Sequence, residues 1–289
     1  MTEARSAPTL PQMVLGRRLT ALREAAGMSA AEAAKTFRGT TSTVTRMEKA
    51  ETRLNFAKVK LLLEAYGVSQ QEKEEFLELL ENADEPGWWQ SFRDALPPWF
   101  GVHVSLETDA TQIRSYEPAV IPGLLQTADY ARAVLERGLH RIGPELLERR
   151  VDLRTRRQEI LTRTSPAPPL LWAVMDETCL RRPVGNPSVM AAQLDHLLLM
   201  ANLPNITLQV YLHSNGLHAA GFGPYTVFRF GIPELSDIVC IDILSGVIRR
   251  ETRGEVSLYR EAFDQMSVAA LSRAATRTFI GDIRKELYP

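Results

Sequence analysis

Several patterns that mark common enzyme and membrane classes are missing from these 289 residues. No run approaches 18 consecutive apolar residues, so no membrane span is expected. Lysine does not occur between Glu74 and Arg284, which leaves this long stretch without the base of a Ser–Lys peptidase dyad. No histidine is followed by glutamate, so the H-E-x-x-H motif of zinc peptidases is absent, as are both glycine-rich phosphate-binding motifs. We therefore expect neither catalytic residues nor a cofactor.

Cysteine is also scarce. Cys179 and Cys240 lie far apart in apolar surroundings, which favours buried, reduced thiols in a cytoplasmic protein. His213 and His218 share one loop, but two imidazoles without a nearby cysteine or carboxylate are weak evidence for a metal, and none is expected. Residues 1–12 lack the apolar core of a signal peptide and are predicted to form a disordered arm.

The net charge of −1 hides an asymmetry along the chain. Residues 1–60 carry 11 Lys and Arg against 5 Asp and Glu, a net charge of +6. Residues 61–289 carry 23 Lys and Arg against 30 Asp and Glu, a net charge of −7. A basic N-terminal segment on an acidic body is the distribution expected of a part that contacts phosphates.

The segment 29–49 predicts two short helices joined by a tight turn. Ser29 and Glu32 have the spacing of a capping box, in which each side chain accepts a backbone N–H of the other residue. The turn is expected near residues 38–40. In the helix that follows, Val44 and Met47 face inward. The outward side chains suit the reading of base edges in a major groove; they are Thr41, Ser42, Thr45 and Arg46, with Lys49 beside them.

This pattern resembles the helix-turn-helix of Xre-type proteins, the family of Cro and phage repressors. The stretch TVTRMEKA is its most specific part. The matching residues are Leu19, Leu22, Arg23, Met28, Ser29, Glu32, Ala34, Val44, Arg46, Met47 and Glu48. Two positions depart from the pattern: Ala30 replaces a frequent glutamine, and Arg38 stands where the turn glycine is usual, with Gly39 after it. Arg38 is therefore expected to adopt a positive φ. The alternative is a generic helical pair.

The resemblance implies a transcriptional regulator that binds double-stranded DNA. One head covers only a few base pairs, so a homodimer on a pseudo-palindromic operator is expected. Basic side chains near the predicted reading helix are expected to contact phosphates. They are Arg17, Arg18, Lys35, Arg38 and Lys49.

Periodicity and caps predict five helices between residues 13 and 82, which form an all-α, repressor-like N-terminal domain. The first helix places Arg23 outward. Residues 83–100 are predicted to be a linker, rich in proline and aromatics such as Trp88 and Trp89. Its aromatics either pack the linker onto a second domain or form a dimer contact or ligand lid.

Residues 101–289 form the predicted second domain. The block from Tyr116 to Ala133 resembles a C-terminal domain that is often fused to Xre-type heads in actinobacterial regulators of development or secondary metabolism. Such genes often neighbour one for a small partner protein, so an antitoxin-like role in binding that partner is the alternative function. The resemblance names no effector. A small-molecule effector is a third possibility, and aromatic candidates for its pocket are Tyr116, Trp172, Tyr211 and Phe222.

The second domain is predicted to be α+β with a small, mainly antiparallel sheet. Strands are expected over 170–175, 206–213, 225–230 and 238–244, with a further one over 247–251. Helices are expected over 107–115, 126–137, 144–163, 188–201, 253–270 and 273–287. The segment 145–163 carries six arginines and four acids. It is either a helix with many internal ion pairs or a second surface for DNA or an acidic partner.

Overall fold

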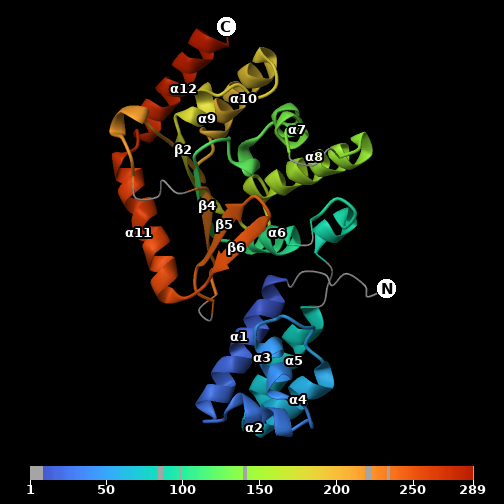
Figure 1. Cartoon of the computed structure of the whole chain (residues 1–289). Helices are drawn as coiled ribbons and strands as arrows, with labels where there is room; N and C mark the ends of the chain where they lie inside the picture. Colours follow the sequence, from blue (N-terminus) through green and yellow to red (C-terminus); the bar gives the residue numbers. More distant parts are fainter. Residues whose placement is uncertain are drawn as a thin grey trace. The chain divides into compact units, whose positions relative to one another are not determined.

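The computed structural model describes residues 9–83, 87–97, 99–138, 142–218, 223–232 and 235–288 (Figure 1). The chain divides into two compact units. Described residues of 9–91 and 99–109, with Ile232 and Leu235, form the first unit. The second unit contains the described residues of 92–97, 110–231 and 236–288.

The described part of the first unit contains six α-helices. They are α1 (Leu10–Ala25), α2 (Ala30–Lys35), α3 (Thr41–Glu48), α4 (Phe56–Ala65), α5 (Gln70–Asn82) and α6 (Phe100–Asp109). Helices α1 to α5 share one apolar core, to which Leu19, Val44, Leu63 and Phe76 contribute fully buried side chains. The five helices predicted between residues 13 and 82 are thus present, and Val44 and Met47 of α3 face the core as expected.

Helix α1 begins earlier than predicted. The expected disordered arm covered residues 1–12, of which 1–8 lie outside the described residues. Thr9 caps the helix, because its hydroxyl accepts the N–H of Gln12 and the Gln12 side chain accepts the N–H of Thr9. Leu10 is buried, and its N–H donates to Ser105 Oγ of α6 at 2.8 Å. These contacts continue the helix into the predicted arm.

The predicted helix over residues 107–115 is wrong. The chain instead forms α6, which ends at Asp109, and a strand β1 (Gln112–Glu117). Ile113 and Tyr116 have a helical spacing, but β1 pairs with strands on both sides: Tyr116 lies opposite Val174 on one neighbour and Tyr225 on the other. This two-sided pairing satisfies the backbone in extended form, which local spacing does not reveal.

The second unit contains a six-stranded sheet in the order β3-β2-β1-β4-β5-β6. Besides β1, its strands are β2 (Leu170–Asp176), β3 (Ile206–Tyr211), β4 (Tyr225–Arg229), β5 (Ile238–Ile243) and β6 (Gly246–Arg250). The pairs β1–β4, β4–β5 and β5–β6 are antiparallel, as most pairs were predicted to be. The pairs β1–β2 and β2–β3 are parallel, because the connections between these strands contain helices that carry the chain back.

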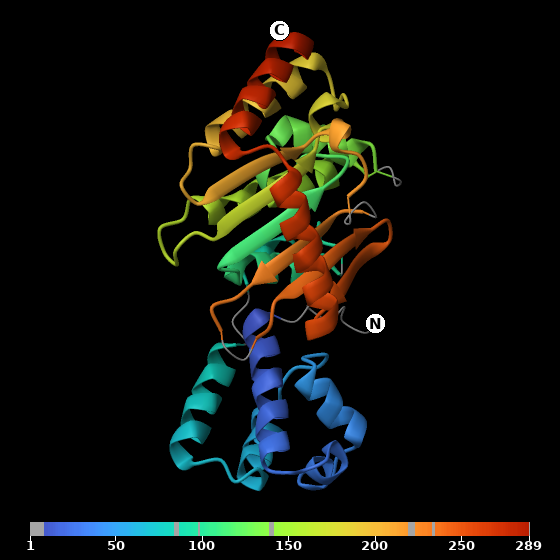
Figure 2. The same cartoon turned by 90° about the vertical axis from the view of Figure 1, so that its left-hand side faces the viewer.

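Helices cover both faces of this sheet. Within the described residues they are α7 (Ala128–Glu136), α8 (Pro144–Gln158), α9 (Thr178–Arg181), α10 (Pro187–Met200), α11 (Arg253–Ala269) and α12 (Arg273–Leu287). Helix α11 crosses one face (Figure 2), where Phe263 and Met266 are buried against Val174 and Tyr225. Helices α7 and α8 lie on the opposite face (Figure 1). The α+β class predicted for this part is confirmed.

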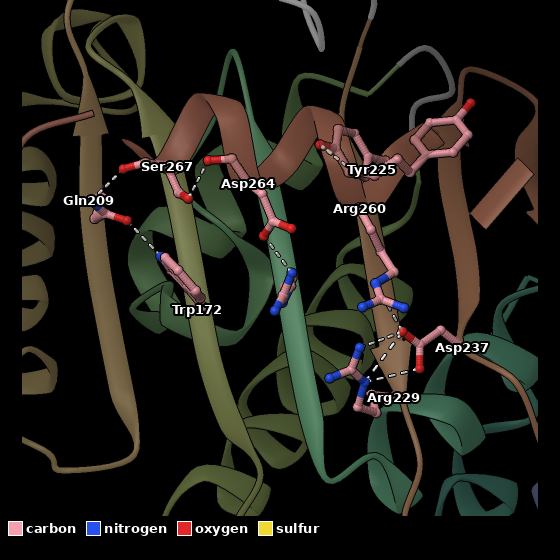
Figure 3. Close-up of polar contacts among 10 residues, drawn as sticks. Trp172, Gln209, Tyr225, Arg229, Asp237, Arg260, Asp264 and Ser267 are labelled. Carbon is pink, nitrogen blue, oxygen red and sulfur yellow. Dashed lines mark hydrogen bonds and ion pairs between the residues drawn. The ribbon is translucent and has the colours of Figure 1, made fainter. Parts of the chain in front are cut away.

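Polar contacts fix α11 on the sheet (Figure 3). Arg114 Nη1 of β1 lies 2.8 Å from Asp264 Oδ1 of α11. Gln209 of β3 accepts the indole N–H of Trp172 at 2.7 Å and donates to the carbonyl of Ser267 at 3.0 Å. These bonds satisfy polar groups that the helix would otherwise bury without partners. Both cysteines are buried, as the sequence predicts.

Within the described ranges, no helix is both long and apolar enough to cross a membrane.

Candidate nucleic-acid interface

The local sequence explains why α2 and α3 form. Ser29 Oγ accepts the N–H of Glu32, whose carboxylate accepts the N–H of Ser29 at 2.8 Å, which completes the predicted capping box. The Ser29 hydroxyl also donates to this carboxylate at 2.7 Å, and this bond, together with the one from the Ser29 N–H, lowers the pKa of Glu32. Thr40 caps α3 by accepting the N–H of Thr43 at 3.2 Å. Both helices therefore begin where a side chain satisfies a free N–H of the first turn.

The turn between α2 and α3 contains the predicted backbone departure. Arg38 has a φ of 54°, in the left-handed region where the family pattern usually has glycine. Its N–H donates to the carbonyl of Lys35, and that of Gly39 donates to Ala34 at 2.8 Å. Gly39 is favoured for a different reason: a Cβ there would lie 2.0 Å from the ring of Phe37, which would have to shift. The two positions thus share the role of one turn glycine.

Helix α3 is held against α1 at its C-terminal end. Gly16 of α1 allows a close approach, since a Cβ at this position would lie 2.4 Å from the carbonyl oxygen of Glu48. Arg23 Nε donates to Glu48 Oε1 at 2.6 Å, and Arg23 Nη1 donates to the carbonyl of Met28 at 2.9 Å. The Arg23 and Glu48 side chains are only 13% and 9% exposed. This pair therefore connects α1, the start of α2 and the end of α3.

The prediction that Arg23 faces outward is wrong, and the role of this pair was not predicted. The hydrogen bond to Glu48 raises the pKa of Arg23, and burial raises the pKa of the nearby Tyr66 to about 12. The spacing of 25 residues between the partners has no helical period, so only the match of both residues to the family pattern pointed to them. Arg23 thus stabilises the packing of α3 against α1.

The predicted base-reading residues share one side of α3. Thr41 and Ser42, in its first turn, are exposed, whereas Thr45 and Arg46, one turn later, are half-buried. Because residues four apart on a helix are neighbours, these side chains form one continuous strip. In the described part of the chain, the Arg46 side chain has no hydrogen-bond or ion-pair partner, in contrast to Arg23. Arg46 is therefore available to a ligand.

The predicted phosphate contacts are more scattered. Lys49 caps the C-terminal end of α3, and Lys35 and Arg38 lie at the end of α2 and in the turn; all three are exposed. Arg17 is exposed on α1. Arg18 lies over the ring of Phe76 in α5 at 5.6 Å, so its guanidinium is directed toward α5. The structure places Lys35, Arg38 and Lys49 near the ends of the α2–α3 pair, and Arg18 apart from it.

The arginine-rich segment 145–163 makes internal contacts in the second unit. Arg149 pairs with Asp94 at 3.1 Å and lies over the ring of Phe92, while Arg156 pairs with Glu159 at 2.9 Å. The others bond to neutral groups or are buried; they are Arg150 with the Ala95 carbonyl, Arg154 with Gln126, Arg157 beside Gly123, and Arg163 with the Ala167 carbonyl. Most of these partners lie outside the helix. These contacts support a structural role rather than a second DNA surface.

The predicted aromatic pocket residues do not all come together. Tyr116 and Tyr211 both contact the imidazole of His218, and the Tyr116 hydroxyl lies 2.8 Å from His218 Nε2. Trp172 instead packs edge-on against Phe263 under α11. Phe222 lies outside the described residues. The three described aromatics therefore lie in two different places: Tyr116 and Tyr211 contact His218, and Trp172 packs under α11.

The linker tryptophans and His213, which the sequence also singles out, contact other parts of the chain. In the first unit, the indole N–H of Trp88 donates to Thr108 Oγ1 of α6, and Trp89 is buried. His213 Nε2 lies 3.2 Å from Asp176 Oδ1, a nearby carboxylate that the sequence reading did not expect. Even so, the His, Cys, Asp and Glu residues that the structure describes form no group of three that could hold a metal ion.

Two family models match parts of the chain. A family model described as a helix-turn-helix domain matches residues 14–76, which include most of α1 and all of α2 to α4. The chain therefore contains a helix-turn-helix domain, which supports a DNA-binding regulator. A second model, described as a domain of unknown function (DUF5753), matches residues 100–282, well over half of the chain. The protein belongs to this family. No curated protein and no solved structure matches the chain.

Proposed function

We propose that this protein is a sequence-specific transcriptional regulator that inserts α3 into the major groove of double-stranded DNA. The observation that carries the proposal is the side of α3 opposite the core. This side presents Thr41, Ser42, Thr45 and Arg46, while Val44 and Met47 on the other side of the helix are buried in the core. A groove-reading helix needs a fixed backbone and donors that no internal partner occupies.

The roles of the individual residues follow from their chemistry. Arg46 grips guanine O6 and N7 with two parallel hydrogen bonds, and the hydroxyls of Thr41, Ser42 and Thr45 complete the base contacts. The exposed Lys35, Arg38 and Lys49 contact phosphates, which set the position of the head without specifying the sequence. This assignment uses no catalytic residue or cofactor.

We propose that the regulator acts in the cytoplasm as a homodimer. One head reads only a few base pairs, so two heads on a pseudo-palindromic site about 34 Å apart supply a longer sequence. Selection of bound DNA from a random library by the full chain tests this directly. The expected product is a pair of inverted half-sites. An enriched single half-site without inverted symmetry would contradict the proposed homodimer.

The role of Arg46 has its own test. Arg46→Ala is expected to reduce the discrimination between the selected operator and scrambled DNA about 10- to 100-fold, the effect of losing one two-pronged guanine contact. The matched control is Lys60→Ala, which removes one exposed positive charge from α4 of the same unit. Discrimination that stays at the wild-type ratio in Arg46→Ala would mean that another surface reads the bases.

A second candidate function rests on the acidic body. Residues 61–289 have a net charge of −7, which suits a small basic partner protein in an antitoxin-like complex. DNA binding would then be autoregulatory. Co-expression with a small protein encoded nearby, followed by size-exclusion chromatography, tests this role. A joint peak at micromolar concentration supports it, and separate peaks count against it.

A small-molecule effector is the remaining proposal for the second unit. The aromatic side chains of Tyr116 and Tyr211 would form part of its site, and a ligand would have to displace the imidazole of His218 that contacts both. Such a ligand changes DNA affinity only if it binds two states of the protein unequally. Native mass spectrometry of gently purified protein tests this by revealing any bound mass of a few hundred daltons.

A further inference from the structure

Three parallel strands of the second unit, β1, β2 and β3, end beside one another. The chain adds β2 and β3 on one side of β1 and then places β4 on the other side. In open sheets, ligands bind outside the carboxyl ends of parallel strands, where the order of the strands reverses in this way. The register places Tyr116, Asp176 and Tyr211 on one face at these ends, because Tyr116 lies opposite Val174 and Asp176 lies opposite Tyr211. Side chains of three strands therefore meet at the position where a ligand is expected.

The imidazole of His218 occupies this position. Its centroid lies 4.9 Å from that of the Tyr116 ring and 4.6 Å from that of the Tyr211 ring, with angles of 87° and 66° between the ring planes. The Tyr116 hydroxyl lies 2.8 Å from Nε2 of the imidazole. Both tyrosines are buried. The two tyrosine rings and this hydroxyl thus accept a flat ring that carries a nitrogen at its edge.

The segment that carries this imidazole is fixed at its start. It begins with a single helical turn, η4 (His213–Asn215), directly after β3. The N–H of His213 donates to Glu177 Oε2 at 3.0 Å, and the Asn215 side chain donates to the carbonyl of Ala269 at 2.9 Å. Gly216 follows with a φ of 71°, and the next side chain, Leu217, is 85% exposed. The freedom of a glycine backbone between the fixed turn and His218 allows the imidazole to leave while η4 stays in place.

The surroundings of the imidazole limit what could replace it. In the described part of the chain, His218 is the hydrogen-bond partner of the buried Tyr116 hydroxyl, and a replacement without a polar edge would leave that hydroxyl unsatisfied at a cost in affinity. Burial lowers the pKa of His218, although the nearby Asp176 opposes this, so the ring is neutral at pH 7. A suitable replacement is therefore flat, neutral and equipped with a ring nitrogen.

We propose that His218 is the internal occupant of a binding site for neutral, planar nitrogen heterocycles at the carboxyl ends of β1, β2 and β3. The ligand ring takes the place of the imidazole between Tyr116 and Tyr211 and bonds to the Tyr116 hydroxyl, while residues 216–218 move away. This inference rests on the small-molecule effector of the proposed function and gives its site and chemical class. It also supplies two states of the protein, with the imidazole in place or displaced, that a ligand binds unequally.

Removal of the internal occupant tests the site in the full chain without DNA. His218→Ala is expected to bind free imidazole, which should raise its melting temperature. Thiophene, a flat ring of similar size without nitrogen, should bind about tenfold more weakly, because it leaves the Tyr116 hydroxyl without a partner. The matched control His196→Ala removes a half-buried imidazole from α10, and free imidazole should not change its melting temperature. Equal responses of both variants to imidazole would overturn the proposal.

A second substitution tests the ligand class. Adding Tyr116→Phe to His218→Ala keeps the aromatic ring and removes only the hydroxyl. The affinity for imidazole is expected to fall about tenfold, to that of thiophene, whose own affinity should not decrease. Circular dichroism verifies that both variants fold. An imidazole affinity that survives the loss of the hydroxyl would overturn the requirement for a ring nitrogen and with it the proposed class.

Displacement in the wild type needs no substitution in the protein that is measured. Benzimidazole has the same nitrogen edge on a larger flat ring, so it is the probe for competition with the attached imidazole. In the full chain with isotope-labelled histidine, the magnetic resonance signal of the His218 ring, identified by its loss in His218→Ala, should move to the position of an exposed histidine. A signal that stays in place at millimolar benzimidazole would make His218 a permanent part of the core and overturn the proposal.

Operator affinity, measured in the same samples, separates the site from the effector function. Displacement of His218 by benzimidazole with an unchanged operator affinity would retain the site and refute its role in regulation. A metabolite that changes operator affinity while the His218 signal stays in place would retain the small-molecule effector and refute this site.

Discussion

Two helices that carry arginine, α3 and α8, use their positive charges in opposite ways. In α8, Arg149 and Arg156 pair with acids, and Arg154 bonds to Gln126. In α3 and its C-cap, Arg46 and Lys49 have no ion-pair partner among the described residues. The helix with more arginines is thus the less available to phosphates. Pairing, rather than the number of basic residues, thus distinguishes a binding surface from a structural one.

Arg23 shows that the same distinction holds inside the first unit. It lies on α1, close in sequence to Arg17 and Arg18, yet its guanidinium is bound to Glu48 and to the carbonyl of Met28. A positive charge in the basic segment therefore does not by itself indicate contact with DNA. Four substitutions test whether a charge in this protein is structural or available.

The largest effect is expected for Glu48→Ala. It leaves the mostly buried Arg23 without its acid, and breaking such a pair costs about 3 kcal/mol of unfolding free energy. Hydrogen exchange measured by mass spectrometry should show faster exchange in α1 and α3. The control Glu24→Ala removes the other acid near Arg23, which is 67% exposed and 3.8 Å away, and should have little effect. Equal protection in both variants would refute the role of the buried pair.

Glu117→Gln is expected to have the next effect, in the second unit. Burial and the nearby Asp242 raise the pKa of Glu117 to about 8, although Arg154 opposes this. Because its folded pKa is above its unfolded one, the carboxyl destabilises the fold progressively as the pH rises from about 4.5 to 8. The glutamine variant lacks this loss and should be more stable at pH 8, by on the order of 2 kcal/mol.

Calorimetric melting at several pH values measures this effect. The melting temperatures of wild type and Glu117→Gln should converge near pH 4, where the wild-type carboxyl is protonated in both states. A constant difference from pH 4 to pH 8 would assign the change to packing and not to ionisation.

A smaller effect is expected on the salt dependence of DNA binding. Lys49→Ala should lower the slope of log affinity against log salt by about 1, because one phosphate contact is lost. Arg156→Ala on α8 removes the same charge from an internally paired residue and should leave the slope unchanged. Fluorescence anisotropy with labelled operator at several salt concentrations provides both slopes. A reduced slope in Arg156→Ala would place α8 on the DNA after all.

The smallest effect is expected for Glu159→Ala. Its pair with Arg156 is exposed on both sides, so its loss should change the free energy of unfolding by about 0.5 kcal/mol or less. Chemical denaturation of the variant and the wild type provides the comparison. A loss of more than about 1 kcal/mol would show that the surface pairs of α8 are more strongly coupled than their exposure indicates.

Local signals predicted the helix-turn-helix well, because its structure is decided within a few residues. Ser29 with Glu32 marks the start of α2, the spacing of Val44 and Met47 sets the buried side of α3, and the position of Arg38 in the turn predicts its positive φ. The same kind of reasoning failed at β1. The spacing of Ile113 and Tyr116 suits a helix, and only the pairing with β2 and β4 makes the segment a strand.

The sequence by itself determined the class of this protein: the capped helices, the outward hydroxyls and Arg46 of α3, and the basic head on an acidic body. Only the folded chain shows which charged side chains have partners and which strands lie side by side. Arg23 reaches Glu48 across 25 residues, and β1 pairs with β2 and β4, which lie far from it in the sequence. The physical reason is range. Caps and helical faces depend on neighbours within one or two turns, whereas ion pairs and strand pairing depend on where distant segments meet.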